Sequence, residues 1–423
     1  MLIPSYVRQR FDLVVAALEK RNLDAKPLIE RLLSLDEARR STQAELDQAL
    51  ASANSIAKEI GQLFKQGATE DINQKKETSA QLKSKAKILQ NKLKETTDEL
   101  QEILYQIPNI PHESVTKGTS DEDNEKILQK GTIPVLESDA LPHWELAKKY
   151  ALIDFELGAK ITGAGFPVYT GKGAKLQRAL INYFLDFNIN AGYGEVQVPH
   201  LVNEASGFGT GQLPDKEGQM YHVTEDDLYL IPTAEVPVTN MYRDSLLHEN
   251  ELPIQLTAYT PCFRREAGSY GAHVRGLNRL HQFDKVELVR IELPENSYKA
   301  LDEMVAHVSK LLESLELPYR ILRLCGGDLG FTSALTFDFE VYSTVQKRWL
   351  EVSSVSNFEA FQANRIKLRY KTSDGKKQLA HTLNGSSLAL PRIIAGLLEN
   401  HQTGNGIRIP KALVQYTGFD HIN

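Results

Sequence analysis

Two stretches near the start of the chain repeat apolar residues at alternating spacings of four and three, and this pattern constrains the fold more than any other feature. Such heptad spacing is typical of helices that pack along one seam as a coiled coil. In the first stretch only Arg39 and Thr42 are polar at seam positions. The first seam consists of Leu28, Leu32, Leu35, Arg39, Thr42, Leu46, Ala49, Ala53, Ile56, Ile60 and Leu63. The second seam consists of Leu82, Ala86, Leu89, Leu93, Thr96, Leu100, Ile103 and Ile107.

A short connection separates the two seams. Residues 66–71 read QGATED, in which Gly67 stops the first helix and the residues after it suit a helix start. Two helices joined by so short a loop fold back as an antiparallel hairpin. At a rise of about 1.5 Å per residue, arms of this length reach roughly 50 Å. The sequence therefore predicts a long coiled-coil arm within an N-terminal domain of residues 1–107.

The second seam carries a local excess of positive charge. Between positions 75 and 94 seven lysines stand against one acid, Glu77, which gives a net charge of +6. The whole chain has a formal net charge of −6, so the other residues carry −12. A basic strip of this kind is typical either of a solvated coiled-coil face or of a surface that binds a phosphate backbone, and charge alone leaves both open. The lysines of this strip are Lys75, Lys76, Lys83, Lys85, Lys87, Lys92 and Lys94.

Composition excludes several classes of protein. The chain has 423 residues, of which 41% are hydrophobic and 25% charged, so it is globular and long enough for two or three domains. A net charge of −6 disfavours indiscriminate coating of nucleic acid. The two cysteines, Cys262 and Cys325, exclude a disulfide framework and are expected to be buried. No apolar run approaches 18 residues, and the first twenty residues include charges, so we expect a cytoplasmic protein without membrane contact.

Beyond the arm, the chain changes to alternating helix and strand patterns. Prolines at 108 and 111 and an acidic run at 121–125 predict a linker over residues 108–140. The body, residues 141–423, has helical patterns at 175–187, 295–316 and 388–399, and strand patterns at 195–199, 228–231, 254–259, 286–292, 336–341 and 349–353. Because the strands are not each followed by a helix, a doubly wound parallel sheet is disfavoured. The expected fold class is α+β, with the helical arm joined to a domain built on a mostly antiparallel β-sheet flanked by helices.

Two strand patterns around a glycine-containing loop carry a cluster of charged residues. The segment at 260–287 reads TPCFRREAGSYGAHVRGLNRLHQFDKVE, with arginines on both limbs and Glu266 two residues after Arg264. Arginine on a rigid strand suits a phosphate or carboxylate bound at two points, and a phenylalanine of this segment offers a stacking face for a base. An ordinary hairpin with surface arginines would show the same local pattern, so other segments must decide.

Two further segments add oxygen ligands and a candidate anion site. Glu351 and Ser354 are three residues apart, and hard oxygen ligands of this kind suit magnesium. The segment NGSSLALPR at 384–392 is expected to form a small-residue turn that enters a helix, with Arg392 one to two turns in. A glycine turn at a helix start can bind an anion, but such a turn alone does not identify an anion site.

Taken in this order, the segments resemble those of the seryl-tRNA synthetases, a class II aminoacyl-tRNA synthetase family, over essentially the whole chain. The segment at 262–287 resembles the family's motif 2, NGSSLALPRII resembles motif 3, and residues 192–199 resemble the end of motif 1, the dimer-interface element. IPTAEVPVTN contains the Thr-x-Glu triplet of the family's serine site. IPNIPHESV, PHWEL, GGDLGF and EVSSVSNFEAFQ are also typical of the family.

The resemblance implies an enzyme that activates L-serine with ATP and Mg²⁺ and transfers it to tRNA(Ser), with charging of tRNA(Sec) left open. It implies a homodimer, catalytic roles for Arg264, Glu287 and Arg392, and magnesium ligands at Glu351 and Ser354. The lysine strip would bind the tRNA. Serine would be bound by Thr233, Ala234, Glu235, Glu287 and Ser386. ATP would be bound by Arg264, Arg265, Glu266, Arg279, Leu280, Phe283, Glu351, Val352, Ser353, Ser354 and Arg392.

Two other functions fit parts of this pattern. A class II-like ligase that charges a carrier protein with a small amino acid would lack the helical arm, so residues 28–107 argue against it. A catalytically inactive paralogue could act as a tRNA-binding or scaffold protein, but the intact motif arginines and glutamates argue against that reading.

Some positions depart from the family pattern without removing a substrate ligand. Arg265, Leu335, Ser387 and Pro391 stand where other residues are common. In the motif 2 loop, Ala272 and His273 replace a frequent basic–acidic pair, which predicts an altered contact with the tRNA acceptor end. The histidines His143 and His281 are expected to be structural rather than catalytic.

Overall fold

The computed structural model describes residues 1–66, 69–215, 218–266 and 275–423, so Ala272 and His273 of the motif 2 loop lie outside the described residues. It divides into two compact units. One consists of Leu2–Glu19 and Leu23–Pro108, and the other of Met1, Lys20–Asn22 and Asn109–Asn423. The first is helical and the second is built on a mostly antiparallel sheet, so the expected α+β class is confirmed. The domain boundaries expected from the sequence stay predictions.

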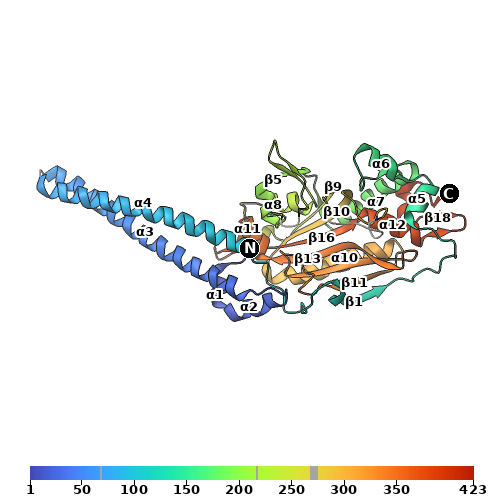
Figure 1. Cartoon of the computed structure of the whole chain (residues 1–423), viewed down its shortest axis with the longest axis horizontal. Helices are drawn as coiled ribbons and strands as arrows, with labels where there is room; N and C mark the ends of the chain where they lie inside the picture. Colours follow the sequence, from blue (N-terminus) through green and yellow to red (C-terminus); the bar gives the residue numbers. More distant parts are fainter. Residues whose placement is uncertain (67–68, 216–217, 267–274) are drawn as a thin grey trace. The chain divides into compact units, whose positions relative to one another are not determined.

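The helical unit is built on two long helices that run side by side (Figure 1). Helix α3 spans Lys26–Gln66 and helix α4 spans Thr69–Gln106, and they follow the short helices α1 (Pro4–Gln9) and α2 (Phe11–Glu19). An apolar cluster between α3 and α4 consists of Leu46, Ala49, Ala86, Leu89 and Leu93. All five are seam positions of the heptad pattern, and the coiled-coil prediction is therefore confirmed.

One polar seam position belongs to a buried ionic cluster. Asp36 is 2% exposed, and its carboxylate pairs with Arg8 at 2.5 Å, Arg39 at 2.9 Å and Arg40 at 3.2 Å. Burial alone would raise the pKa of Asp36, but the hydrogen bond from Arg39 and the nearby positive charges outweigh it and lower the pKa. The polar residue Arg39 is tolerated in the apolar seam because it neutralises this carboxylate.

The second unit is organised by an eight-stranded sheet in the order β1-β11-β12-β13-β16-β10-β9-β4. Its neighbouring strands are antiparallel except for β4 and β9, which confirms that the sheet is not doubly wound. The strands are β1 (Glu125–Lys130), β4 (Gly194–Glu195), β9 (Ile254–Phe263), β10 (Gln282–Glu292), β11 (Tyr319–Arg323), β12 (Leu335–Ser343), β13 (Arg348–Glu359) and β16 (His381–Ala389).

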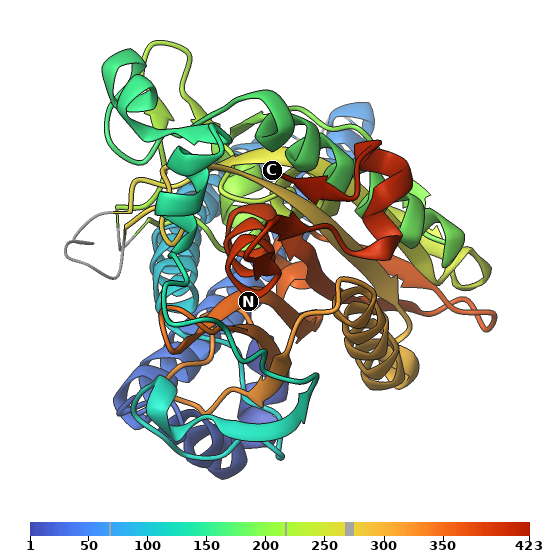
Figure 2. The same cartoon turned by 90° about the vertical axis from the view of Figure 1, so that its right-hand side faces the viewer.

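Side-chain alternation along β10 gives this sheet one apolar face and one face that carries the polar site. Val286 and Leu288 pack into the main core with helices α7 (Gly171–Asn190), α10 (Ser297–Ser314) and α12 (Leu390–Asn400), which are seen beside the sheet in Figure 2. Glu287 lies between these two residues and therefore points to the other face. On that face helix α9 (Glu235–Asn240) packs against β10 through Val238 and Val289.

Shorter elements complete the second unit. Its other helices are α5 (His143–Lys149), α6 (Phe155–Ile161), α8 (Glu204–Thr210), α11 (Ala360–Arg365) and α13 (Lys411–Thr417), with 3₁₀ turns at Asp121–Asp123, Glu249–Glu251 and Pro294–Asn296. The small sheets are formed by β2 (Ile153–Asp154), β3 (Val168–Tyr169), β5 (Leu201–Asn203), β6 (His222–Val223), β7 (Leu228–Leu230), β8 (Leu246–His248), β14 (Arg369–Lys371), β15 (Lys377–Leu379), β17 (Gln402–Thr403), β18 (Gly406–Arg408) and β19 (His421–Ile422). No helix in the described ranges combines the length and apolar character that a membrane span needs.

The segment expected as a turn before the last long helix is a strand instead. Residues 384–387 lie within β16, which pairs with β10 on one side and β13 on the other. Small residues are needed there because α10 packs closely on the sheet, and a Cβ on Gly385 would lie 3.1 Å from the Met304 Cε atom. Helix α12 begins at Leu390, which puts Arg392 in its first turn rather than one to two turns in. Strand β1 lies within the stretch 108–140 that was expected to be a linker.

Candidate active site

Glu287 is the centre of a buried polar cluster in the second unit. Its carboxylate accepts hydrogen bonds from the Thr233 hydroxyl at 2.6 Å and the Ser386 hydroxyl at 3.0 Å, and it pairs with the Lys285 ammonium at 2.7 Å. Ser386 stands directly opposite Glu287 in the neighbouring strand, and Lys285 is two residues away on the same strand face. The carboxylate is only 1% exposed, so its charge is held by these partners rather than by water.

Glu235 lies at the start of α9 beside this cluster. Its backbone N–H donates to the Thr233 hydroxyl oxygen at 3.2 Å, and its carboxylate accepts a 2.6 Å hydrogen bond from the Gln362 side chain. The pKa of Glu235 is raised to about 7, chiefly by burial; the Gln362 hydrogen bond opposes the rise and the nearby Glu287 charge adds to it. Ala234 is fully buried in the small core under α9. The five residues expected to bind serine are therefore brought together.

Arginine and phenylalanine side chains of the two limbs of motif 2 also meet. The Arg264 guanidinium carbon lies 5.3 Å from the centroid of the Phe283 ring. Arg279 and Glu266 form a 2.8 Å ion pair across the limbs, and Leu280 is 4% exposed. An aromatic face beside a guanidinium can hold a planar base by stacking. The Arg265 side chain, by contrast, is exposed. Its backbone N–H donates to the Gln219 carbonyl at 2.9 Å.

Arg392 bridges two of the predicted segments. Its Nε–H donates to the Asn278 carbonyl at 3.0 Å, and its Nη1–H donates to the Glu351 carbonyl at 2.8 Å. The Glu351 carboxylate lies 3.7 Å from the same nitrogen. Backbone carbonyls and a carboxylate thus fix a guanidinium that is still 27% exposed, so it can receive an anion.

A bulge in β13 places Glu351 and Ser354 on one face. Side chains three residues apart in a regular strand point to opposite faces. The register between β12 and β13 shifts at this point, because Glu340 pairs with Glu351 and Phe339 pairs with Ser353. The extra residue in β13 shifts the side-chain alternation by one position, so Glu351 and Ser354 point to the same face of the sheet. Val352 and Ser353 are both buried. The Ser353 hydroxyl donates to the Ser386 carbonyl at 2.6 Å and so ties this strand to the Glu287 cluster.

The neighbouring strand brings a further carboxylate beside Glu351 and Ser354. Asp338 stands opposite Ser354, and its Oδ1 atom is buried without a hydrogen-bond partner among the described residues. Burial, and next the Glu351 charge, raise the pKa of Asp338 well above its ordinary value, although a hydrogen bond from Ser354 opposes this. No group of three or more His, Cys, Asp or Glu side chains that could hold a metal occurs in the described ranges. Two carboxylates and a hydroxyl nevertheless fit Mg²⁺, which keeps several waters and uses few protein ligands.

Sequence reasoning missed four polar residues of this region, namely Lys285, Asp338, Gln362 and Asn278. The alternation of side chains along a strand could have identified Lys285, which lies two residues before Glu287. Gln362 contacts Glu235 across 127 residues of sequence, and no local pattern signals such a pair. No local pattern signals Asn278 either, because its carbonyl accepts a hydrogen bond from Arg392, which lies 114 residues away in the sequence.

The seven lysines of the basic strip lie on α4 in the helical unit. Lys75 forms an ion pair with Glu59 of α3, and the Lys76 ammonium lies 5.1 Å from the centroid of the Phe64 ring. The other five are exposed and form no ion pair within the described part of the chain: Lys83, Lys85, Lys87, Lys92 and Lys94. Five of the seven lysines, rather than all seven, are therefore available to bind a phosphate backbone.

An antiparallel sheet with these motifs along its central strands defines a class II aminoacyl-tRNA synthetase. Residues 220–401 match the family model described as "tRNA synthetase class II core domain (G, H, P, S and T)". Residues 1–111 match the model described as "Seryl-tRNA synthetase N-terminal domain". The chain belongs to the seryl-tRNA synthetase family.

Individual relatives resemble the chain over its full length. A serine–tRNA ligase of Salinibacter ruber is 50% identical, covering 97% of this chain and 96% of the relative. A serine–tRNA ligase of Chlorobaculum parvum is 47% identical and covers both chains completely. The crystal structure of seryl-tRNA synthetase from Pyrococcus horikoshii complexed with ATP has a TM-score of 0.93 at 32% identity, covering 100% of this chain and 99% of that one.

Proposed function

We propose that this chain is an ATP-dependent ligase that activates L-serine as seryl-adenylate and transfers the seryl group to tRNA(Ser). The observation that carries the proposal is the buried set of Thr233, Glu235, Glu287 and Ser386, tied through Ser353 to the strand that carries Glu351. The relatives named serine–tRNA ligase and the relative complexed with ATP support it. Charging of tRNA(Sec) is the open extension of the same activity.

The buried cluster suits the two polar ends of serine. Glu235 and Glu287 supply carboxylates for the ammonium group, and Thr233 and Ser386 supply hydroxyls that already hydrogen-bond to Glu287. Alanine would leave the groups that receive the serine hydroxyl without a partner, so it is rejected strongly. Threonine must be excluded by shape, because its hydroxyl satisfies the same partners.

The motif 2 and motif 3 residues suit ATP. Phe283 and Arg264 would hold the adenine, Glu266 and the backbone at Leu280 would read its edge, and Arg392 would bind phosphate oxygens. The serine carboxylate then attacks the α-phosphorus in line, and pyrophosphate leaves. The ribose hydroxyl of the 3′-terminal adenosine next attacks the acyl carbon and releases AMP. Both steps depend on positioning and on charge stabilisation, which arginines supply without a protein nucleophile.

Glu351, Ser354 and the buried Asp338 would hold Mg²⁺. When bound, the cation neutralises part of the triphosphate charge. The orphaned Asp338 oxygen supports this assignment, because a buried carboxylate oxygen without a hydrogen bond costs free energy that a cation ligand would recover. A bound cation would also offset the repulsion between the Asp338 and Glu351 carboxylates, which raises the pKa of Asp338.

We further propose the partners and the organisation that the family suggests. The exposed lysines of α4 would bind the tRNA backbone, and the chain would act as a cytoplasmic homodimer. Residues 1–107 would form the tRNA-binding domain, 108–140 a linker and 141–423 the catalytic domain. Removing residues 35–103 should then leave serine activation intact and abolish tRNA charging, whereas full charging by the shortened chain contradicts the role of the arm.

Two structural features disfavour the alternative functions. A carrier-protein ligase has no use for two helices of 41 and 38 residues with an exposed lysine strip. A binding protein without catalysis has no use for a carboxylate that stays buried among hydroxyl donors, because such a cluster costs stability unless it binds something.

ATP–pyrophosphate exchange with each of the twenty amino acids tests the proposal. Exchange should depend on serine and Mg²⁺, and it should vanish in Glu287→Gln, which removes the central charge at constant size. The exposed Glu313→Gln variant on α10 is the matched control and should keep full activity. Exchange with alanine or glycine in preference to serine, or none with any amino acid, contradicts the proposal.

A further inference from the structure

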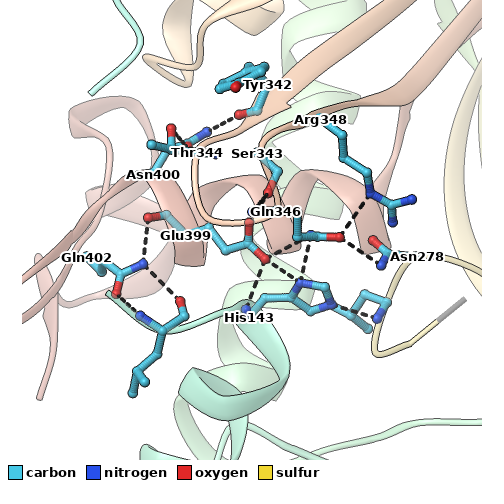
Figure 3. A network of polar contacts seen from close by, with 12 residues as sticks. His143, Asn278, Tyr342, Ser343, Thr344, Gln346, Arg348, Glu399, Asn400 and Gln402 are labelled. Carbon is cyan, nitrogen blue, oxygen red and sulfur yellow. Dashed lines mark hydrogen bonds and ion pairs between the residues drawn. The ribbon is translucent and has the colours of Figure 1, made fainter. Parts of the chain in front are cut away.

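A second buried polar network lies outside the residues assigned to substrates (Figure 3). At its centre His143 of α5 and Glu399 of α12 form a 2.6 Å pair between Nδ1 and Oε1, and both side chains are completely buried. Glu399 also accepts the His143 backbone N–H at 3.0 Å, the Gln346 amide at 2.9 Å and the Ser343 hydroxyl. This carboxylate is therefore saturated with donors and anchors α5 and the β12–β13 hairpin to α12.

The pairing decides which nitrogen of His143 carries a proton. Burial would raise the pKa of Glu399, but the hydrogen bond from His143 and further donors lower it, so Glu399 is an ionised acceptor. A carboxylate only accepts, and His143 Nδ1 must therefore donate. The other ring nitrogen, Nε2, accepts the Leu277 backbone N–H at 2.9 Å. The ring thus serves as a donor on one side and as an acceptor on the other, in one fixed tautomer.

The imidazole meets the returning limb of motif 2 at a glycine. Gly276 has a positive φ of 68°, and a Cβ on it would lie 2.3 Å from His143 Nε2. A residue with a side chain cannot occupy this position without pushing the turn away from the ring. The turn at 275–278 is therefore seated directly on the imidazole.

The same turn leads to the residues assigned to ATP. Asn278 follows Leu277, and its carbonyl accepts the Arg392 Nε–H at 3.0 Å. Its side-chain amide donates to Gln346 Oε1 at 3.1 Å, and the Gln346 amide returns to Glu399. Arg279 and Leu280 come next in the chain. A closed circuit of hydrogen bonds thus connects the His143–Glu399 pair to the position of Arg392.

We propose that His143 is a positioning residue for the ATP half of the active site. By offering Nε2 as an acceptor to Leu277, it fixes the turn at 275–278, and with it the carbonyl that orients Arg392 and the backbone of Leu280. Within the described residues the network makes no contact with Thr233, Glu235, Glu287 or Ser386. The inference rests on the proposed function for the identity of the nucleotide, and it deepens that function by assigning a role to a residue that touches no substrate.

Asparagine and glutamine each replace one of the two ring nitrogens of His143. Comparing the two variants distinguishes a positioning role of His143 from a packing role. An asparagine at 143 can place a donor near the Nδ1 position and keep the Glu399 contact, but it does not reach Leu277. A glutamine can place its carbonyl oxygen near the Nε2 position and accept the Leu277 N–H. We expect His143→Asn to raise the KM for ATP on the order of tenfold, the equivalent of one hydrogen bond. His143→Gln should restore the ATP value to within about twofold, and the KM for serine at saturating ATP should stay constant in both.

Two further variants keep the test independent of folding defects. Gly276→Ala leaves the buried His143–Glu399 pair in place and pushes the turn off the ring, so it should raise the KM for ATP as His143→Asn does. His401→Phe is the matched control, because His401 is a buried histidine two residues after Glu399 that bonds the Leu315 carbonyl and Arg408 instead. It should lower the melting temperature and change neither KM.

The proposal is overturned if His143→Asn and His143→Gln give the same KM for ATP, or if the KM values for ATP and serine rise together. It is also overturned if Gly276→Ala leaves the KM for ATP unchanged. The dissociation constant of ATP, measured by calorimetry without amino acid, should follow the same order among the variants. Because that measurement needs no turnover, a chain that failed to activate serine would refute the proposed function while still testing the role of His143.

Discussion

The raised pKa of Glu235 predicts how serine binding depends on pH. In the free chain burial holds this pKa at about 7, so at pH 6 about nine in ten Glu235 side chains carry a proton. In the proposed site the serine ammonium pairs with the ionised Glu235 carboxylate, and binding must then release that proton. Affinity therefore falls as pH drops below the pKa and reaches a plateau above it.

The magnitude follows from the pKa alone. The fraction of ionised Glu235 changes about tenfold between pH 8 and pH 6, so the KM for serine should rise about tenfold over the same interval. Glu235→Gln cannot ionise, and its KM should be independent of pH in this window. It should also lie about 10- to 100-fold above the value of the unaltered chain at pH 8, because a hydrogen bond to a charged group is lost.

The assay is ATP–pyrophosphate exchange at saturating ATP and Mg²⁺ from pH 6 to pH 8.5, with Glu313→Gln as the control. Glu313 is exposed, and hydrogen bonds from Lys130 and Tyr319 lower its pKa, so this variant should reproduce the full pH profile. A flat profile in the unaltered chain would refute the reasoning. So would a profile in Glu235→Gln with the original slope.

The raised pKa of Glu235 also makes the stability of the fold depend on pH. Stability changes with pH in the direction opposite to serine affinity. A carboxyl whose pKa is raised by folding binds more protons in the folded chain, so stability declines as pH rises from the unfolded pKa of 4.5 to about 7. Above pH 7 the cost is up to about 3 kcal/mol, at about 1.4 kcal/mol per pKa unit. Glu235→Gln should therefore raise the free energy of unfolding at pH 8, measured with denaturant, while it impairs serine binding. A destabilised variant at that pH contradicts the assigned cause of the shift.

Three further predictions follow from charge and burial. Replacing Lys83, Lys85 and Lys87 by glutamine should reduce the salt slope of tRNA binding by about two to three, and an unchanged slope in filter binding would make the strip a solvated face. Asp338→Asn should raise the Mg²⁺ concentration for half-maximal exchange at least severalfold and weaken Mn²⁺ binding measured by spin resonance, whereas unchanged metal affinity removes Asp338 from the site. Both cysteines are buried, and burial raises the pKa of Cys262 to about 11, so Cys262 should react with an aromatic disulfide reagent only after unfolding; rapid reaction of Cys262 in the native chain contradicts this.

The arm was predictable from the sequence because its information is local. Each seam position is defined by neighbours three and four residues away, and the cluster of Leu46, Ala49, Ala86 and Leu89 is made of such positions. The central strands β9, β10, β12 and β13 were also predictable, since their apolar residues are continuous or alternate with a period of two.

The strand β16 was not predictable on the same grounds. Its residues Asn384, Gly385, Ser386 and Ser387 have weak strand propensity and are typical of turns. They form a strand because β10 and β13 satisfy their backbone groups on both sides and α10 leaves room only for small side chains. Tertiary packing overrides local propensity here. Ser386 was singled out as a site residue through family resemblance, and its role stays a prediction, whereas the turn expected at this position was wrong.

The proposed site has two halves that are held in place by different parts of the structure. This difference predicts which kinetic constant each variant changes. The proposed serine half rests on side chains of β10, of β16 and of the segment before α9 that hydrogen-bond to one another, with Glu287 at the centre. The ATP half rests on turn backbone held by the remote His143–Glu399 pair. The halves meet where the Ser353 hydroxyl donates to the Ser386 carbonyl. A variant in either support should therefore change the KM of one substrate, whereas Ser353→Ala, which cuts the connection, should lower kcat and leave both KM values nearly unchanged.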